Sequence, residues 1–298
     1  MPWIQLQIPA DPDNADQLED LLMEMGADAV SMEDAADQPL YEPDPGTTPL
    51  WSQTTVTGLF QSDRDIEQLC ADVRDAWHQQ TQQSMPEIEV TLVEDKDWER
   101  AWMDDFQPLR FGERLWIVPS WHEAPDPEAA NLMLDPGLAF GTGTHPTTAL
   151  CLEWLDGQDM AGKQVIDYGC GSGILGLAAL LLGADHVIGV DTDPQALEAS
   201  RENARRNGVD ESRLDLYLPE DEPDTLCDVM LANILAQPLI GLASRLAALT
   251  RPGGDLVLSG ILSNQAREVM EAYEPWFIMD EPEQREEWIR LTGRRKDR

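Results

Sequence analysis

The stretch VIDYGCGSGILG, residues 165–176, decides the fold. It begins as an apolar strand pattern, passes three glycines at 169, 171 and 173, and continues as an apolar helical pattern. A strand, a glycine turn and a helix form the first unit of a doubly wound sheet, where ligands bind at the carboxyl ends of strands. A dinucleotide fingerprint needs another glycine at position 174, which is Ile174. The spacing weakens the expectation of a bound pyrophosphate, and such a turn also serves tight strand-to-helix packing.

Strand and helix patterns alternate around this turn, from about residue 108 onward. Continuous apolar runs predict strands at 163–169, 186–191, 214–219, 227–234 and 254–261, separated by amphipathic helices at 174–184, 194–208 and 237–250. Apolar strands between such helices imply a parallel sheet covered on both faces. The tail, residues 276–295, predicts a closing antiparallel β-hairpin. The fold class is therefore α/β, a doubly wound, mostly parallel, Rossmann-like sheet.

The amino-terminal part has a different pattern. Its order is β-α-β-β-α-β, which matches a small ferredoxin-like α+β domain. Nothing in it resembles catalytic chemistry, so it predicts a recognition domain over residues 1–93. Residues 94–107 carry Trp98, Trp102 and Phe106 at helical spacing, which predicts an interdomain linker helix with a packed aromatic stripe. The second domain spans residues 108–298.

Charge is the most unusual property of the composition. The chain has 57 acidic and 20 basic residues, for a net charge of −37. Such a surface repels a phosphate backbone, so direct nucleic-acid binding is not expected. It attracts a basic partner by steering that weakens with salt. Adaptation of all surfaces to high salt explains the acidity equally well, so charge alone does not identify a partner.

Other features of the composition exclude several classes of protein. No apolar run is long enough to cross a membrane, and the first residues lack a signal-peptide pattern, so a cytoplasmic protein is expected. The four cysteines form no CxxC pair, which predicts no metal site and no disulfide framework. They are expected to be buried apolar residues. No coiled coil is present, and a monomer is the default.

Asp191 ends the second predicted parallel strand, 22 residues after Gly169. A carboxylate at this place accepts hydrogen bonds from both hydroxyls of a ribose. The alternative is that Asp191 caps the next helix, but Asp193 before Pro194 already suits that role. A nucleoside site with neither a phosphate clamp nor a P-loop lysine suggests S-adenosylmethionine.

Two further segments lie at the expected site. Asn233 in LANIL is a polar residue at the end of an apolar strand, where its side-chain carbonyl can orient a target amine; its alternative role is to cap the following helix. The glycine-rich stretch 134–148 predicts a loop that acts as a lid or a positioning segment, and its last residues, THPTT, lead into a helix. His145 is interpreted as structural rather than catalytic.

Several motifs together resemble one family. LDPGLAFGTGTHPTT, VIDYGCGSGILG, VDTDPQALEASRENARRNG and ANILAQPL, behind a small amino-terminal domain, are similar to the bacterial ribosomal protein L-eleven methyltransferase family, of the class I methyltransferase superfamily. The similarity covers essentially the whole chain. It implies methylation of the α-amine and lysine ε-amines of that basic ribosomal protein, with S-adenosylmethionine as cofactor and the amino-terminal domain as the docking site. Carried over by position, the cofactor contacts are Thr148, Gly169, Asp191 and Asn233.

The mechanism expected from these residues is positional. Asn233 orients an uncharged amine, and no dedicated strong base is assigned. Three alternatives share part of the pattern. A nucleic-acid methyltransferase is disfavoured by the charge, a nicotinamide oxidoreductase by Ile174, and a non-catalytic assembly factor by the intact nucleoside site.

Overall fold

The computed structural model describes residues 2–35, 51–93, 106–135 and 145–297. The chain divides into two compact units, Met1–Asp105 and Phe106–Arg298. The linker helix predicted over 94–107 falls almost entirely outside the described residues, as do its aromatic residues Trp98 and Trp102.

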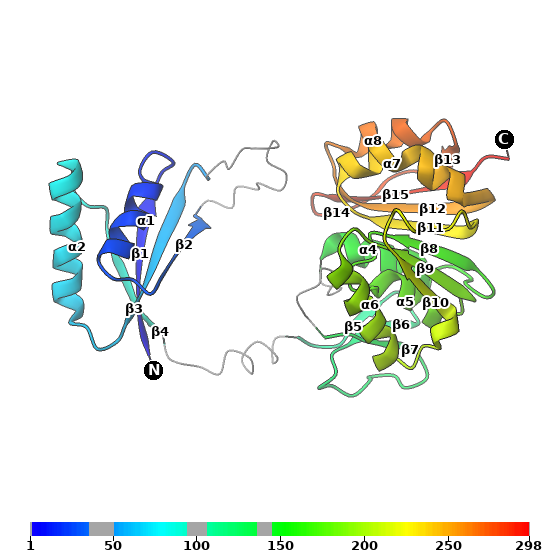
Figure 1. Cartoon of the computed structure of the whole chain (residues 1–298), viewed down its shortest axis with the longest axis horizontal. Helices are drawn as coiled ribbons and strands as arrows, with labels where there is room; N and C mark the ends of the chain where they lie inside the picture. Colours follow the sequence, from blue (N-terminus) through cyan, green and yellow to red (C-terminus); the bar gives the residue numbers. More distant parts are fainter. Residues whose placement is uncertain (1, 36–50, 94–105, 136–144, 298) are drawn as a thin grey trace. The chain divides into compact units, whose positions relative to one another are not determined.

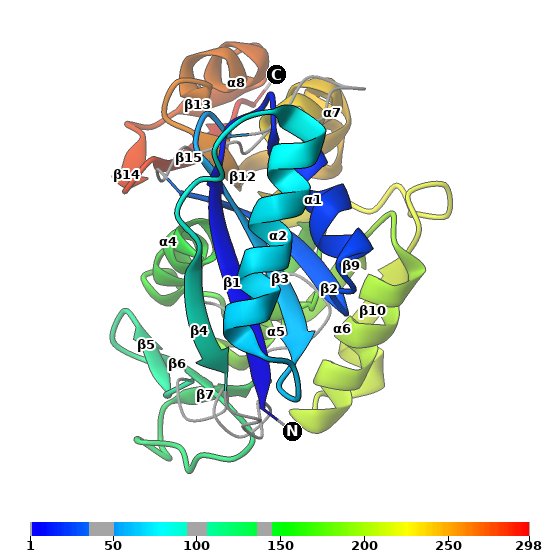
Figure 2. The same ribbon diagram turned by 90° about the vertical axis from the view of Figure 1, so that its left-hand side faces the viewer.

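The first unit is a four-stranded antiparallel sheet with two helices. Its elements are β1 (Trp3–Ala10), α1 (Ala15–Glu24), β2 (Ala29–Asp34), β3 (Thr54–Gln61), α2 (Ile66–Thr81) and β4 (Glu89–Val93). The strand order is β2-β3-β1-β4, with every neighbouring pair antiparallel. Figure 2 shows α1 and α2 side by side on one face of this sheet. The predicted small α+β unit with a β-α-β-β-α-β order is confirmed.

Alternation in β1 explains how this unit builds its core. Ile4, Leu6 and Ile8 are fully buried, whereas the glutamines between them are partly exposed. Successive side chains of a strand point to opposite faces, so the three aliphatic residues face the helices. They pack in one cluster with Leu18 of α1 and Trp77 of α2.

The second unit is built on a large sheet. Its strands are β8 (Gln164–Tyr168), β9 (His186–Val190), β10 (Leu214–Tyr217), β11 (Cys227–Asn233), β12 (Thr250–Leu262), β13 (Phe277–Met279), β14 (Glu283–Arg285) and β15 (Trp288–Arg295). The order is β10-β9-β8-β11-β12-β15-β13, with β14 paired to β15. The first five strands are parallel, and β13, β14 and β15 join antiparallel. The predicted sheet and its closing antiparallel strands are confirmed.

Helices cover both faces of this sheet. They are α4 (Pro146–Asp156), α5 (Ile174–Leu181), α6 (Pro194–Arg206), α7 (Ala236–Leu249) and α8 (Ala266–Tyr273). In Figure 1, α7 and α8 lie on one face, and α4, α5 and α6 lie on the other. Two separate apolar clusters match this arrangement, one under α4 and α5 and one under α7 and α8. The two-sided burial is why these strands are continuously apolar.

A small third sheet precedes α4 and was not expected from the sequence. It contains β5 (Leu109–Phe111), β6 (Leu115–Val118) and β7 (Ala130–Met133). β5 and β6 pair antiparallel, whereas β6 and β7 pair parallel. Leu115, Ile117 and Leu132 of this sheet join the cluster that contains α4 and α5.

All four cysteines are free and buried, as expected. Among the described residues, no helix has the length and apolarity needed to cross a membrane. The same residues contain no group of three or more side chains arranged to hold a metal ion.

Candidate functional site

Three neighbouring strands end at one edge of the large sheet and bring the predicted residues together. β9, β8 and β11 are adjacent and parallel. Asp191 follows β9, Gly169 follows β8, and Asn233 is the last residue of β11. Parallel strands present their carboxyl ends at a common edge, which is where ligands bind in such sheets.

The glycine turn between β8 and α5 has a backbone that suits glycine. Gly169, Gly171 and Gly173 have φ angles of 77°, 54° and 80°, in the left-handed region. At Gly169 a second constraint applies, because an added Cβ would lie 2.2 Å from Cγ2 of Ile234. The backbone N–H of Gly169 donates to the carbonyl of Val190 at 2.7 Å, which ties the turn to the end of β9.

Asp191 lies against this turn. One carboxylate oxygen accepts the N–H of Gly171 at 2.8 Å, and the other accepts the N–H of Asp193 at 3.0 Å. Asp193, in contrast, caps α6 by accepting the N–H of Gln195 at 2.8 Å. The capping role therefore belongs to Asp193. Each oxygen of Asp191 has a second lone pair, so the carboxylate retains capacity to accept a ligand hydroxyl.

Asp167 is a second carboxylate at this edge, and the sequence interpretation missed it. It lies within β8, is 1% exposed, and accepts the N–H of Gly176 in the first turn of α5 at 2.9 Å. Burial raises its pKa to about 7, the bond from Gly176 opposes this shift, and the charge of Asp191 adds to it. A lone carboxylate inside an apolar strand was the signal available in the sequence.

Thr148 and Asn233 are in direct contact. The side-chain amide nitrogen of Asn233 donates to the hydroxyl of Thr148, on the first turn of α4, at 3.3 Å. Thr148 is 3% exposed, whereas Asn233 is partly exposed. The residue at the N-cap of α7 is Leu235, and no side-chain hydrogen bond caps that helix. The alternative role of Asn233 as a cap for α7 is therefore not observed.

His145 has a structural role at the start of α4. Its Nδ1 accepts the backbone N–H of Thr147 at 3.3 Å, and its ring lies edge-on to Trp288 with centroids 4.8 Å apart. Burial lowers the pKa of His145, although Glu286 and Glu287 oppose the shift. A neutral imidazole is the form that can accept the N–H, so the geometry and the direction of the shift agree.

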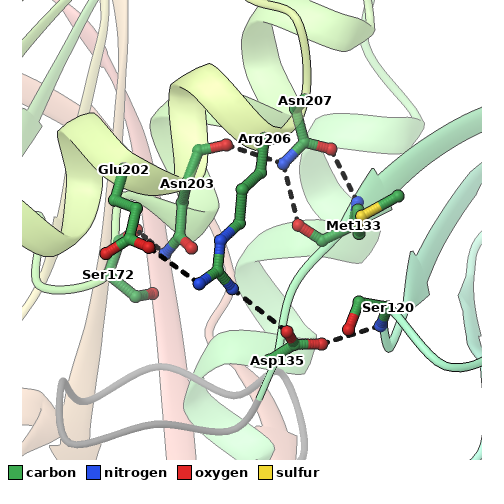
Figure 3. A network of polar contacts seen from close by, with 8 residues as sticks. All are labelled: Ser120, Met133, Asp135, Ser172, Glu202, Asn203, Arg206 and Asn207. Carbon is green, nitrogen blue, oxygen red and sulfur yellow. Dashed lines mark hydrogen bonds and ion pairs between the residues drawn. The ribbon is translucent and has the colours of Figure 1, made fainter.

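Polar side chains of α6 and of its C-cap residue, Asn207, connect the glycine turn to the end of β7 (Figure 3). Asn203 donates to the carbonyl of Ser172, within the turn, at 2.9 Å. Asn207 accepts the N–H of Met133 at 2.7 Å and donates to its carbonyl at 2.8 Å, as a neighbouring strand would. These bonds fix the turn and the end of β7 to the same helix.

The same network fixes Asp135, the second residue of the predicted glycine-rich loop. Arg206 pairs with Asp135 at 3.0 Å and with Glu202 at 2.8 Å, while Asp135 accepts the N–H of Ser120 at 2.7 Å (Figure 3). Residues 136–144 of the loop lie outside the described residues. The sequence did not predict these contacts, because polar residues such as Asn203 and Arg206 are also typical of the solvent-exposed face of an amphipathic helix.

The groups at this edge define the chemistry of a ligand. The side chains that bond to the glycine turn are Asp191, Ser200 and Asn203, which are acidic or neutral. A turn lined in this way suits a nucleoside that carries positive charge rather than phosphates, since an acidic edge stabilises a cation.

Comparisons with known proteins agree with this chemistry. The family model described as ribosomal protein L11 methyltransferase (PrmA) matches residues 2–296. A protein of that name from Marinobacter nauticus is 89% identical over 297 residues, covering 100% of both chains, and one from Pseudomonas aeruginosa is 58% identical over 296 residues, covering 99% of both. A crystal structure described as ribosomal protein L11 methylase, from Lactobacillus delbrueckii subsp. bulgaricus, is 32% identical, with a TM-score of 0.57 over 64% of this chain and 100% of that chain. The resemblance seen in the sequence is confirmed, and the chain belongs to the ribosomal protein L11 methyltransferase family.

Proposed function

We propose that this chain transfers methyl groups from S-adenosylmethionine to amines of ribosomal protein L11, namely the α-amine and lysine ε-amines. Membership of the family supports the reaction class, the cofactor and the substrate. The single observation that supports the placement of the reaction is the common edge, where Gly169, Asp191 and Asn233 end three adjacent strands.

The residues at this edge fit the cofactor. Asp191 would accept the ribose hydroxyls, since both of its oxygens lie at the turn and each has a free lone pair. The backbone of Gly169 would allow close approach of the nucleoside. The negative charge of Asp191, close to the buried carboxyl group of Asp167, suits a molecule that carries a sulfonium and an ammonium.

When bound, S-adenosylmethionine would supply an electrophilic methyl group to the lone pair of an uncharged amine, with the N–C bond forming in line as the C–S bond breaks and the thioether leaves. The chain must therefore hold the amine without its extra proton. A lysine amine with an ordinary pKa near 10.4 is mostly protonated at neutral pH, and removal from water lowers that pKa. Leu235, two residues after Asn233, is 50% exposed, and this apolar side chain would help to remove the amine from water.

Asn233 is the proposed catalytic residue. Its amide nitrogen donates to Thr148, and no described residue donates to its carbonyl oxygen, which would accept an N–H of the target amine. That bond aims the lone pair of the amine. Catalysis is then chiefly positional, since holding two reactants in line can contribute on the order of 7 to 11 kcal/mol in the best models.

Several expectations from the sequence belong to this proposal. Residues 1–93 dock the ribosomal protein, residues 94–107 link the two domains, and residues 108–298 carry the reaction. The partner is a basic protein rather than a nucleic acid, and the chain acts as a monomer in the cytoplasm, where ribosomal proteins are made.

The test uses intact-mass spectrometry of unmethylated ribosomal protein L11 after incubation with this chain and S-adenosylmethionine. We expect mass increments of whole methyl groups. Asp191→Ala should weaken cofactor binding about 10- to 100-fold, because hydrogen bonds to a charged group contribute about 1.5 to 3 kcal/mol.

Asp210→Ala is the matched control. Asp210 also accepts the N–H of the residue two positions later, at 2.9 Å, but it lies after α6 and away from the glycine turn. This variant should bind the cofactor and methylate as the wild type does. Cofactor binding without any mass increment would contradict the proposal that ribosomal protein L11 is the substrate. Normal cofactor binding by Asp191→Ala would contradict the proposed cofactor site.

A further inference from the structure

Helix α4 carries Thr148, and the last strands of the chain hold this helix at three places. At its start, Trp288 of β15 packs edge-on against His145. At its middle, Arg290 of β15 donates to the backbone carbonyl of Leu150 at 2.7 Å. Near its end, Arg285 of β14 donates to both carboxylate oxygens of Glu153, at 2.8 and 2.9 Å. Thus β14 and β15 set the position of α4 on the sheet.

Arg290 is the unusual member of this set. It is only 9% exposed, and its second Nη pairs with Glu283. Its Nε is buried and has no hydrogen-bond partner among the described residues. Its charge also acts on the neighbouring Cys151, whose pKa burial nevertheless raises to about 12.

Stability alone does not explain an arginine at this position. A buried guanidinium loses its hydration, and one of its N–H groups gains no acceptor in return among the described residues. Its carboxylate partner, Glu283, is 53% exposed, so solvent screens the pair. An apolar side chain of similar length would fill the same space at equal or lower cost.

We propose that Arg290 is a positioning residue for methyl transfer. Its bond to Leu150 fixes α4 two residues after Thr148, and so places the Thr148 hydroxyl within reach of the Asn233 amide. That contact determines which way the amide faces, and therefore whether its carbonyl oxygen meets the target amine. The inference rests on the proposed function, since it concerns how Asn233 is held for that reaction.

The carboxyl end of α4 is also held by hydrogen bonds. Asp156 is 6% exposed and accepts the N–H groups of Glu113 at 2.7 Å and Arg114 at 2.9 Å. These bonds fix the carboxyl end of α4 to the β5–β6 turn. Arg290 holds the middle of the helix at Leu150, two residues after Thr148.

The experiment compares Arg290→Met with wild type for cofactor Kd, kcat with ribosomal protein L11, and the thermal midpoint. We expect kcat to fall at least tenfold, with the cofactor Kd within about twofold and the thermal midpoint equal or higher. Arg290→Lys, which restores one donor, should recover part of kcat. The side-chain amide resonance of Asn233 should shift in Arg290→Met, and this second readout is independent of turnover.

Arg294→Met is the matched control. Arg294 lies on the same strand, pairs with Asp255 at 2.9 Å and is 65% exposed, so the substitution removes an ion pair without touching α4. It should leave kcat unchanged. Unaltered kcat and an unaltered Asn233 resonance in Arg290→Met would overturn the inference, as would a lower thermal midpoint with normal kcat in the folded protein. A wild type that binds cofactor but never methylates would instead overturn the proposed function.

Discussion

At the scale of single residues, two separate structural constraints require glycine at position 169, and the sequence motif does not distinguish them. The φ of 77° at Gly169 favours glycine, and the position of a Cβ is already filled by Cγ2 of Ile234. Ile234 follows Asn233 directly, so a side chain at Gly169 would move the residue that we propose holds the amine.

Gly169→Ala should therefore lose more stability than left-handed strain alone explains. The strain costs roughly 1 to 2 kcal/mol, and overpacking against Ile234 adds about 1 to 3 kcal/mol. Gly162→Ala is the control, because Gly162 has a φ of 70° and nothing lies within 4 Å of its added Cβ. Denaturant unfolding measures both free energies, and equal losses would show that Ile234 yields without cost.

Asp167 predicts a specific dependence of stability on pH. Its pKa, about 7, lies above the ordinary value of 3.8, so the folded chain keeps a proton that the unfolded chain releases. Its stabilising contribution is complete below the ordinary pKa and is lost as the pH rises through about 7. Asp167→Asn cannot ionise and should avoid this loss.

The measurement is the free energy of unfolding of both proteins, without cofactor, at pH 5 and pH 8. From pH 5 to pH 8, we expect the wild type to lose on the order of 2 to 3 kcal/mol more free energy of unfolding than Asp167→Asn, since one pKa unit is worth about 1.4 kcal/mol. A difference that stays constant with pH would mean that Asp167 is ionised throughout.

At the scale of elements, the long periodic segments were predictable and the short ones were not. The pattern around β8, α5 and β9 extends over many residues, so its period is unambiguous. β5 and β6 have three and four residues and are separated by charged residues at a turn, which hides their pairing. Their burial depends on packing against α4, which lies far along the chain, so the local sequence pattern does not predict it.

The site divides in the same way. Gly169, Asp191 and Asn233 end strands, and the topology of a parallel sheet is sufficient to bring strand ends together. Residues whose contacts lie on a distant element of the chain could not be predicted in this way. Asn207 contacts Met133, and Arg290 contacts Leu150, across 74 and 140 residues, and each belongs to a pattern typical of an ordinary helix or strand.

At the scale of the whole molecule, the acidity is unevenly spread. Arg64 and Arg74 are the only Lys or Arg residues in the described part of the first unit, and its helices carry exposed acids such as Asp16, Asp20 and Glu24. The strands β1 and β3 contain no charged residue at all. If residues 1–93 dock a basic protein, the helices of this unit are the source of the attraction.

Salt should therefore act on the protein substrate rather than on the cofactor. Screening shortens the Debye length from about 30 Å at 0.01 M to about 3 Å at 1 M, so kcat/KM for ribosomal protein L11 should fall at least tenfold across this range. The cofactor Kd should change little, and the thermal midpoint should rise as self-repulsion among 57 acidic residues is screened. A kcat/KM that is insensitive to salt would leave salt adaptation as the explanation of the acidity.

Two variants with equal charge change separate the first unit from the rest of the chain. One variant converts three exposed acids of α1, Asp16, Asp20 and Glu24, to amides. The other converts three exposed acids of α8 and its C-cap, Glu268, Glu271 and Glu274, to amides. Both reduce the net charge by the same amount, so both should raise the thermal midpoint in low salt to a similar extent. Only the first should lower kcat/KM for the ribosomal protein and reduce its slope with salt, because steering depends on where the charge lies. Equal effects of the two variants on kcat/KM would show that net charge alone attracts the substrate, and that the helices of the first unit have no special part in docking.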